Sequence, residues 1–500
     1  IYEGGMRTMT EIAKKKRGMP SSFTILLALL AIVAVITVIV SGTSGGAVTA
    51  ARLSDFCTAP ILGFADALPV CLFVMILGGF LGMMTETGAL DNGIAVLVQK
   101  LKGNEIMLIP VLMLIFSLGG TTYGMCEETV PFYALLAATM MAAGFDPMVG
   151  AATVLLGAGC GCLGSTVNPF AVGAAVDALT GVGIEVNQSI IIGLGAVLWI
   201  VTTAMSIFFV MNYAKKVKAD KGSTILSMQE LKDAEEAHGK AASEVHKEVK
   251  LTGRQKGVLI AFAFTFVVMI VGFIPLADLN EGVANFFDAG AVYDADGNAV
   301  VQGWSALITG LPIGQWYFDE ASTWFFLMAV LIGIIGGLSE KQIVNTFITG
   351  AADMMSVVLV IALARGISVL MANTGLDVYV LDAAANALAG LSGVIFAPMS
   401  FLVYFGLSFL IPSTSGMATV SMPIMGPLAV KLGFSPEVMV MIFSAAIGVV
   451  NLFTPTSGAI MGGLALAKIE WTTWLKFALK LIVALSVVCA VILTVACVLL

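Results

Sequence analysis

The sequence predicts an all-α polytopic membrane protein, built from inverted repeats with two re-entrant hairpins and two broken helices. Hydrophobic residues make up 59% of the 500 residues and charged residues only 11%, against roughly 25% charged residues in globular proteins. The apolar stretches are also continuous over the length of about 20 residues that crosses a hydrocarbon core as a helix. A transmembrane β-barrel is excluded, because its strands alternate in polarity.

Nine stretches are long enough to span a bilayer. In order along the chain they are 22–42, 66–87, 147–178, 188–213, 256–275, 320–338, 349–372, 436–468 and 475–500. Two further apolar blocks, 104–143 and 395–432, are interrupted near their middle by Gly, Pro, Ser and Thr. We expect these blocks to form re-entrant hairpins, although two ordinary spans in each block would keep the same parity.

The charges predict the topology and the division of the chain. The N-terminus, 1–21, and the linker 214–255, which holds nine of the 24 Lys and Arg residues, are expected in the cytoplasm. The loop 276–319 has six acidic residues and no Lys or Arg, so it is expected outside, as is the C-terminus. The first half is then 22–213, and the other predicted parts are the connecting spans 256–348 and the second half 349–500.

An internal repeat relates the two halves. Gly144-Phe145-Asp146-Pro147 in the first half corresponds to Gly433-Phe434-Ser435-Pro436 in the second. Eighteen residues after the proline of each motif comes a second polar break. Gly124-Met125 and Gly416-Met417 precede a proline by the same offsets, and Thr87-Gly88 matches Thr374-Gly375. In the predicted topology the two units start on opposite sides of the membrane. They are therefore inverted repeats, which form the fold of many secondary transporters.

Four breaks in the apolar stretches are expected to surround one watery cavity. They are Gly119–Glu128, Gly164–Phe170, Pro412–Thr419 and Asn451–Gly458. Non-helical backbone is tolerated at membrane depth only inside protein or beside water. Half-helix N-termini would offer N–H groups to anions, and the unwound carbonyl groups would offer oxygens to small cations. The alternative is that these small residues only permit close helix packing.

Glu127 and Glu128 lie at the turn of the first hairpin, where an unpaired carboxylate is costly. We therefore expect one of them to bind a substrate ammonium, a proton or sodium. The alternative role is to cap the next helix, and Glu128 is better placed for it.

Arg365 is the only basic residue well inside a predicted span. Its guanidinium can hold a carboxylate through two parallel hydrogen bonds. Pairing with Glu127 or Glu128, or with exposed carbonyl groups, explains it equally well.

Several classes are disfavoured by what the sequence lacks. It has no P-loop and no potassium-channel filter motif, and both histidines lie in the linker, so no His-Glu-x-x-His motif occurs in a span. We expect neither an enzyme nor a resident metal or other cofactor, and no nucleic-acid partner.

The chain resembles the YfcC-type branch of the anaerobic C4-dicarboxylate carrier family, within the ion transporter superfamily. Four segments carry the resemblance, namely 124–133, 164–170, 364–367 and 412–416. The resemblance implies a homodimer in the bacterial cytoplasmic (inner) membrane, with a fixed scaffold and a transport domain that moves like an elevator. Relatives in this branch are described as antiporters of basic amino acids, arginine against ornithine. The hairpin tips depart from the Ser-Asn-Thr motif of the superfamily.

Our leading interpretation is a secondary transporter that exchanges a basic amino acid. The alternatives are Na⁺- or H⁺-coupled transport of C4-dicarboxylates or peptide-like acids, and a channel. The predicted substrate-binding residues are Thr121, Thr122, Glu127, Glu128, Ser165, Thr166, Asn168, Arg365, Ser413, Thr414, Ser415, Asn451, Thr454 and Thr456. A coupling Na⁺ would bind near Thr121, Asn168, Ser413 and Asn451.

Overall fold

The computed structural model describes residues 22–90, 92–93, 96, 104–244, 250–274, 276–279, 281–294, 299–409, 411 and 413–500. Within them the regular secondary structure is helical apart from one two-stranded sheet. The predicted cytoplasmic N-terminus 1–21 and Pro412 of the third predicted break lie outside the described residues.

The first half begins with α1 (Ser22–Ser41), α2 (Leu53–Asp66) and α3 (Leu68–Glu86). The predicted hairpin follows as η1 (Glu105–Met107), α5 (Leu108–Tyr123), η2 (Glu127–Thr129) and α6 (Val130–Ala142). The broken span is α7 (Pro147–Leu163), η3 (Pro169–Gly173) and α8 (Ala174–Thr180). It is closed by α9 (Gln188–Ala219), and η4 (Lys221–Ser223) and α10 (Met228–Glu244) follow in the linker.

The second part begins with α11 (Gly253–Phe273), α12 (Leu276–Leu279), α13 (Glu281–Phe287), β1 (Val292–Tyr293) and β2 (Ala299–Val301). The next helices are α14 (Phe318–Gly336), α15 (Glu340–Asp353), α16 (Met355–Thr374) and α17 (Leu376–Leu388). The last segments are α18 (Gly393–Leu407), α19 (Thr414–Lys431), α20 (Pro436–Val450), α21 (Gly458–Leu466) and α22 (Trp471–Leu499).

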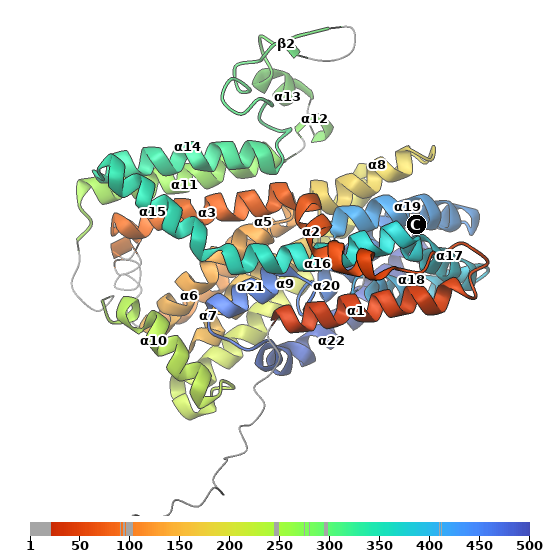
Figure 1. Cartoon of the computed structure of the whole chain (residues 1–500), viewed down its shortest axis with the longest axis horizontal. Coiled ribbons are helices and arrows are strands. Elements are labelled where there is room, and N and C mark those ends of the chain that lie inside the picture. The colour runs from red at the N-terminus through yellow and green to blue at the C-terminus, as the bar shows by residue number, and fades with distance from the viewer. Residues whose placement is uncertain are drawn as a thin grey trace, which may run out of the picture.

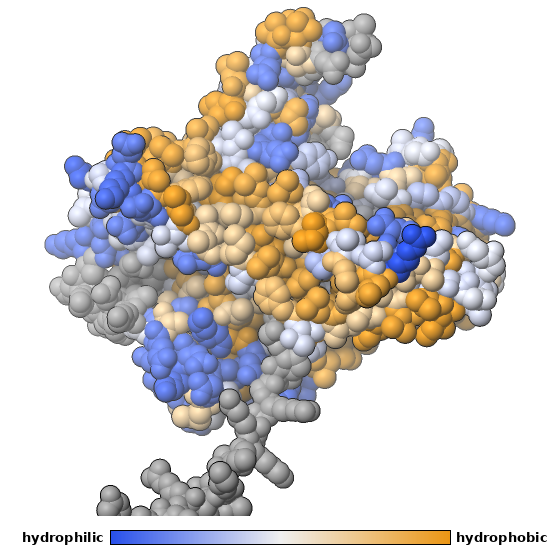
Figure 2. Space-filling model, in the orientation of Figure 1, coloured by the Kyte–Doolittle hydropathy of each residue, from blue (hydrophilic) through white to orange (hydrophobic). Residues whose placement is uncertain are grey.

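Eight helices of the described chain are long and apolar enough to cross a membrane. Seven match predicted unbroken spans, and the eighth, Glu105–Tyr123, is the first arm of the predicted hairpin. Side chains such as Val35 and Ile39 of α1 remain 58% and 66% exposed. Figure 2 shows a broad hydrophobic surface across the molecule, with hydrophilic side chains gathered over α10. An apolar surface of this extent is stable only against lipid or another apolar partner.

Several predicted boundaries were wrong. The stretch 349–372 is two helices, because α15 ends at Asp353 and α16 begins at Met355. The prediction missed α2, which carries a proline, Pro60, inside an apolar helix. The first break starts only after Tyr123, and α19 is helical from Thr414, so the third break precedes Thr414. The breaks at Gly164–Asn168 and Asn451–Ser457 are confirmed.

Corresponding helices of the two halves make corresponding contacts (Figure 1). α5 and α6 both pack on α7, and α18 and α19 both pack on α20. The contact of α6 with α21 corresponds to that of α19 with α8. In the same way, the contact of α2 with α16 corresponds to that of α15 with α3. α7 and α20 contact each other and are almost completely buried, which explains why both are apolar on every face.

The first arm of the predicted hairpin, α5, packs closely on α7 because glycines on each helix face the backbone of the other. A Cβ at Gly120 would lie 2.2 Å from the Ala158 carbonyl oxygen, and a Cβ at Gly161 would lie 2.1 Å from that of Ser117. No side chain larger than hydrogen fits at either position. Small residues of this kind let membrane helices approach closely and gain van der Waals contact.

The linker was expected to be a charged loop, but its helix α10 packs against α6. His238 is only 8% exposed, and its Nε2 lies 3.1 Å from the Leu466 carbonyl oxygen at the end of α21. Glu230 accepts a hydrogen bond of 2.9 Å from the backbone N–H of Glu470. The linker therefore fastens the connection between α21 and α22 to α6.

The stability of this connection should depend on pH through His238. Burial, and secondarily the nearby charge of Lys468, lowers the pKa of His238 below its usual value of 6.5, although the hydrogen bond to Leu466 opposes this. The folded state then binds fewer protons than the unfolded state, so His238 favours folding above about pH 6.5 and progressively less as the pH falls through its lowered pKa. Thermal unfolding of His238→Gln in detergent from pH 5 to 7.5 should show a smaller loss of Tm at acid pH than the wild type. An equal loss in both proteins would contradict this.

Candidate functional site

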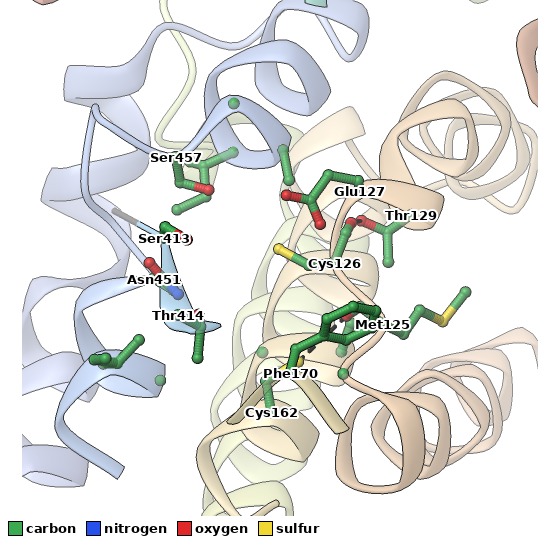
Figure 3. Close-up of a pocket in the computed structure, with 18 of the residues that line it drawn as sticks. Met125, Cys126, Glu127, Thr129, Cys162, Phe170, Ser413, Thr414, Asn451 and Ser457 are labelled. Atoms are coloured by element: carbon green, nitrogen blue, oxygen red, sulfur yellow. Dashed lines mark hydrogen bonds between the residues drawn. The ribbon is translucent and has the colours of Figure 1, made fainter. Parts of the chain in front are cut away.

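A cavity of about 170 Å³ lies where the four helix breaks meet (Figure 3). It is lined by the turn between α5 and α6, the ends of α7 and α20, the starts of η3, α19 and α21, and the middle of α16. Elements more than 280 residues apart in the sequence thus enclose one space with room for a single small metabolite.

The first turn presents Glu127 to this cavity and uses Glu128 to hold itself together. Gly124 adopts φ +78°, and a Cβ on it would lie 2.6 Å from the Oδ1 of Asn168, so only glycine fits. Glu128 is 2% exposed, and its Oε2 accepts a 2.9 Å hydrogen bond from the Cys126 N–H. Glu127 has no ion-pair partner within the described chain, and Figure 3 shows its carboxylate directed across the cavity towards Ser457.

The opposite wall comes from the start of α19 and the end of α20. Ser413 caps α19, and its Oγ accepts a 3.1 Å hydrogen bond from the Gly416 N–H. Thr414 and Ser415, in the first turn, also line the cavity, as does Asn451 at the C-terminal end of α20. The free N–H groups of a first helical turn favour an anionic group, and the C-terminal carbonyl groups favour a cation.

Asn168 holds the break in the α7 span open. Its Oδ1 accepts hydrogen bonds from the N–H groups of Phe170 and Ala171 at 2.9 and 3.3 Å, and its Nδ2 donates to Ser165 Oγ at 2.9 Å. The same side chain touches the turn at Gly124. Asn168 therefore connects the hairpin turn to the broken helix.

Replacing Asn168 by alanine should lower the free energy of unfolding by roughly 2–3 kcal/mol, because two backbone N–H groups lose their acceptor. Asn168→Ser is neutral and keeps a shorter N-cap oxygen that can accept from these N–H groups, so its loss should be smaller, about 1 kcal/mol. Denaturation of the purified variants in detergent measures both losses. Equal stability of the alanine variant and the wild type would contradict the role of Asn168.

The structure brings eight of the fourteen predicted binding residues to the cavity. These are Glu127, Asn168, Arg365, Ser413, Thr414, Ser415, Asn451 and Thr456.

The other six do not line the cavity. They are Thr121, Thr122, Glu128, Ser165, Thr166 and Thr454. Their polar atoms bond within the protein. For example, Thr121 Oγ1 donates to the Gly164 carbonyl oxygen at 2.7 Å, and Thr166 Oγ1 donates to the Thr121 carbonyl oxygen at 3.0 Å. These two threonines fasten the end of α5 to the break after α7.

Arg365 has a partner that the sequence analysis missed. Its Nε lies 3.1 Å from Asp66 Oδ2, at the end of α2. Neither Glu127 nor Glu128 lies within ion-pair distance of it among the described residues. Glu127 and Arg365 are the charged residues of the described cavity wall.

The cavity also contains residues that the sequence analysis assigned no role. Two cysteines, Cys126 and Cys162, line it, as do two serines, Ser444 and Ser457, and the aromatic residues Phe170, Phe318 and Tyr133. Cys162 Sγ donates to the Met125 carbonyl oxygen at 3.3 Å. The position of Cys126, directly before the two glutamates, and that of Ser457, within a predicted break, could have indicated them.

A second, larger cavity of about 660 Å³ separates α3 and α15 from α6 and α21. Its wall includes Ala138 of α6, Thr346 and Thr349 of α15, and His238 of α10. Helix α6 is thus less tightly packed against α15 than against α7. No group of three or more His, Cys, Asp or Glu residues suited to a metal ion occurs in the described chain.

The family model of the C4-dicarboxylate anaerobic carriers (DcuC) matches residues 53–498. A protein of Haemophilus influenzae, named only "Uncharacterized protein", is 28% identical over 445 residues, covering 89% of this chain and 78% of its own length. The Escherichia coli protein named "Putative basic amino acid antiporter YfcC" is 27% identical over 440 residues, covering 86% of this chain and 77% of its own length.

Two solved structures also align with the chain. They are Neisseria gonorrhoeae MtrF, described as illuminating a class of antimetabolite efflux pumps, and the Alcanivorax borkumensis YdaH transporter. MtrF has a TM-score of 0.44 at 16% identity, over 97% of this chain and 96% of its own. YdaH has a TM-score of 0.46 at 15% identity, over 94% and 97%.

Proposed function

Because the chain belongs to the C4-dicarboxylate anaerobic carrier family and is a membrane transporter, we propose that it exchanges basic amino acids of the arginine and ornithine type. The observation that carries this proposal is the charge of the cavity wall. Glu127 faces the cavity without an ion-pair partner in the described chain, whereas Arg365 is paired with Asp66. An unpaired carboxylate in such a site favours a cationic ligand. The name of the Escherichia coli relative agrees with this substrate class.

The two ends of a basic amino acid have matching groups across the cavity. Its side-chain cation would bind Glu127. Its α-carboxylate would lie near Ser413, Thr414 and Ser415, where α19 begins, and where a helix N-terminus adds N–H donors and partial positive charge. Arg365 has further N–H donors besides the one that contacts Asp66, and these would be available to the same carboxylate.

We propose that the two halves are inverted repeats whose re-entrant hairpins carry the site. The matching contacts of α5 and α6 with α7, and of α18 and α19 with α20, support this. The moving part would comprise the hairpins and the broken helices, and it would slide past a scaffold formed by α3, α14, α15 and their counterparts. The cavity between α6 and α15 lies along that boundary. In the bacterial inner membrane, two copies of the protein would form a homodimer through their scaffolds. This contact would keep the scaffolds in place while the moving parts slide past them.

Exchange predicts trans-stimulation in vesicles. Liposomes that contain the purified protein and are preloaded with ornithine should take up labelled arginine several times faster than unloaded ones. Glu105→Gln, which removes a charge paired with Lys218, should leave this stimulation unchanged. Failure of every basic amino acid to stimulate uptake would overturn the proposal.

A second candidate is a coupled transporter of C4-dicarboxylates, favoured by Arg365 in the cavity and by the family description. Uptake of succinate, driven by a Na⁺ or H⁺ gradient and unaffected by arginine, would establish it. Rapid ion flux without trans-stimulation would instead indicate a channel.

A further inference from the structure

The pair Asp66–Arg365 has a role beyond joining two helices. We propose that Asp66 sets the charge preference of the cavity by neutralising Arg365 from behind. The inference rests on the proposed function for the identity of the preferred ligand, but its direction can be tested with either substrate class.

The pair is held in place by the packing of α2 on α16. A Cβ on Gly63 would lie 2.3 Å from the Gly366 backbone nitrogen, and a Cβ on Gly366 would lie 2.7 Å from the Ala59 carbonyl oxygen. Backbone therefore lies against backbone one residue after Arg365 and three residues before Asp66. Helices that touch through glycines cannot move apart locally without losing that contact.

The two members of the pair face different surroundings. Arg365 lines the cavity and has 24% of its side chain exposed, whereas Asp66 is 52% exposed and does not line the cavity. Arg365 therefore belongs to the cavity wall, whereas the carboxylate that balances its charge lies outside that wall. Asp66 acts through Arg365, so it is a positioning residue rather than a binding residue.

Charge arithmetic gives the direction of the effect. With both carboxylates ionised, Glu127 and Asp66 contribute two negative charges and Arg365 one positive charge, so the group of three carries −1. Replacing Asp66 by asparagine brings the group to zero and leaves the full charge of the guanidinium facing the ligand. At the distances across such a cavity, one charge changes affinity by about tenfold.

The test measures binding of L-arginine and of succinate to purified protein by thermal shift and calorimetry. Asp66→Asn should weaken arginine binding by about tenfold and strengthen succinate binding, so that their ratio changes by more than tenfold. Asp66→Glu keeps the charge and should restore the wild-type ratio. Glu105→Gln breaks the 2.7 Å ion pair with Lys218 at the far end of α5, and it should not change the ratio.

The coupling to Arg365 has its own control. In an Arg365→Gln background, adding Asp66→Asn should leave the ratio within about twofold of that of the single variant, because the partner is gone. An unchanged ratio in Asp66→Asn, or an equal change in Glu105→Gln, would overturn the inference. If the wild type binds succinate and no basic amino acid, the proposed substrate fails. Stronger succinate binding by Asp66→Asn would then still support the role of Asp66.

Discussion

Replacing Glu127 by glutamine should weaken arginine binding about 30- to 150-fold, which corresponds to roughly 2–3 kcal/mol. The carboxylate faces the cavity and has no ion-pair partner in the described chain, so a ligand cation would be its charge partner. Glutamine keeps the shape and the hydrogen-bonding oxygen but removes the charge. Calorimetric titration of arginine into the purified protein, with citrulline as a neutral ligand of similar shape, measures the contribution of charge.

Glu128→Gln is the matched control, because Glu128 holds the backbone of the turn and does not line the cavity. Its side chain still accepts from the Cys126 N–H, so arginine affinity should change by less than about threefold, while stability falls by about 1 kcal/mol. Wild-type arginine affinity in Glu127→Gln would remove this residue as the counter-charge. A large loss in Glu128→Gln alone would exchange the two roles.

Replacing Ala138 by tryptophan should lower transport by at least about tenfold and leave arginine affinity within about twofold. Ala138 lies on α6 and lines the 660 Å³ cavity that separates this helix from α15. The cavity has room for an indole ring, so folding should cost no more than the roughly 1–3 kcal/mol typical of overpacking. If α6 must move along α15 during transport, a filled gap opposes that movement without touching the binding cavity.

Ala263→Trp is the control for adding an indole ring elsewhere, because Ala263 lies on an exposed face of α11. Uptake into vesicles and binding in detergent are measured for both variants. Wild-type uptake by Ala138→Trp would mean that the gap does not close during transport. An equal loss of uptake and of binding would indicate a folding defect rather than a blocked movement.

Much of the fold was predictable because the hydrophobic pattern is strong. Lipid requires continuous apolar helices, so all seven unbroken spans and both broken ones were found, although the predicted span 349–372 began inside α15. The helices α2 and α15 were missed or merged because their ends are set by packing rather than composition. Their positions follow from close contacts such as that of Gly63 with Gly366, which involve distant parts of the chain.

The cavity was predictable in outline, since breaks in apolar helices carry their own sequence signal. The sequence could not predict which polar groups face the cavity. A hydroxyl side chain in a helix break can either hydrogen-bond to the protein or point into the cavity, and the sequence does not distinguish the two. Thr121 bonds to the Gly164 carbonyl oxygen, whereas Thr414 lines the cavity. Asp66 was missed for a similar reason, because its partner lies 299 positions further along the chain.

The attachment of α10 to both halves limits how the halves can be exchanged between related proteins in evolution. This helix touches α6 in the first half and, through His238 and Glu230, the turn between α21 and α22 in the second. A chimaera that joins halves from two relatives at the linker would mismatch one of these contacts, whichever parent supplies the helix. The two repeats should therefore descend and diverge as one unit, rather than as modules that recombination can exchange freely.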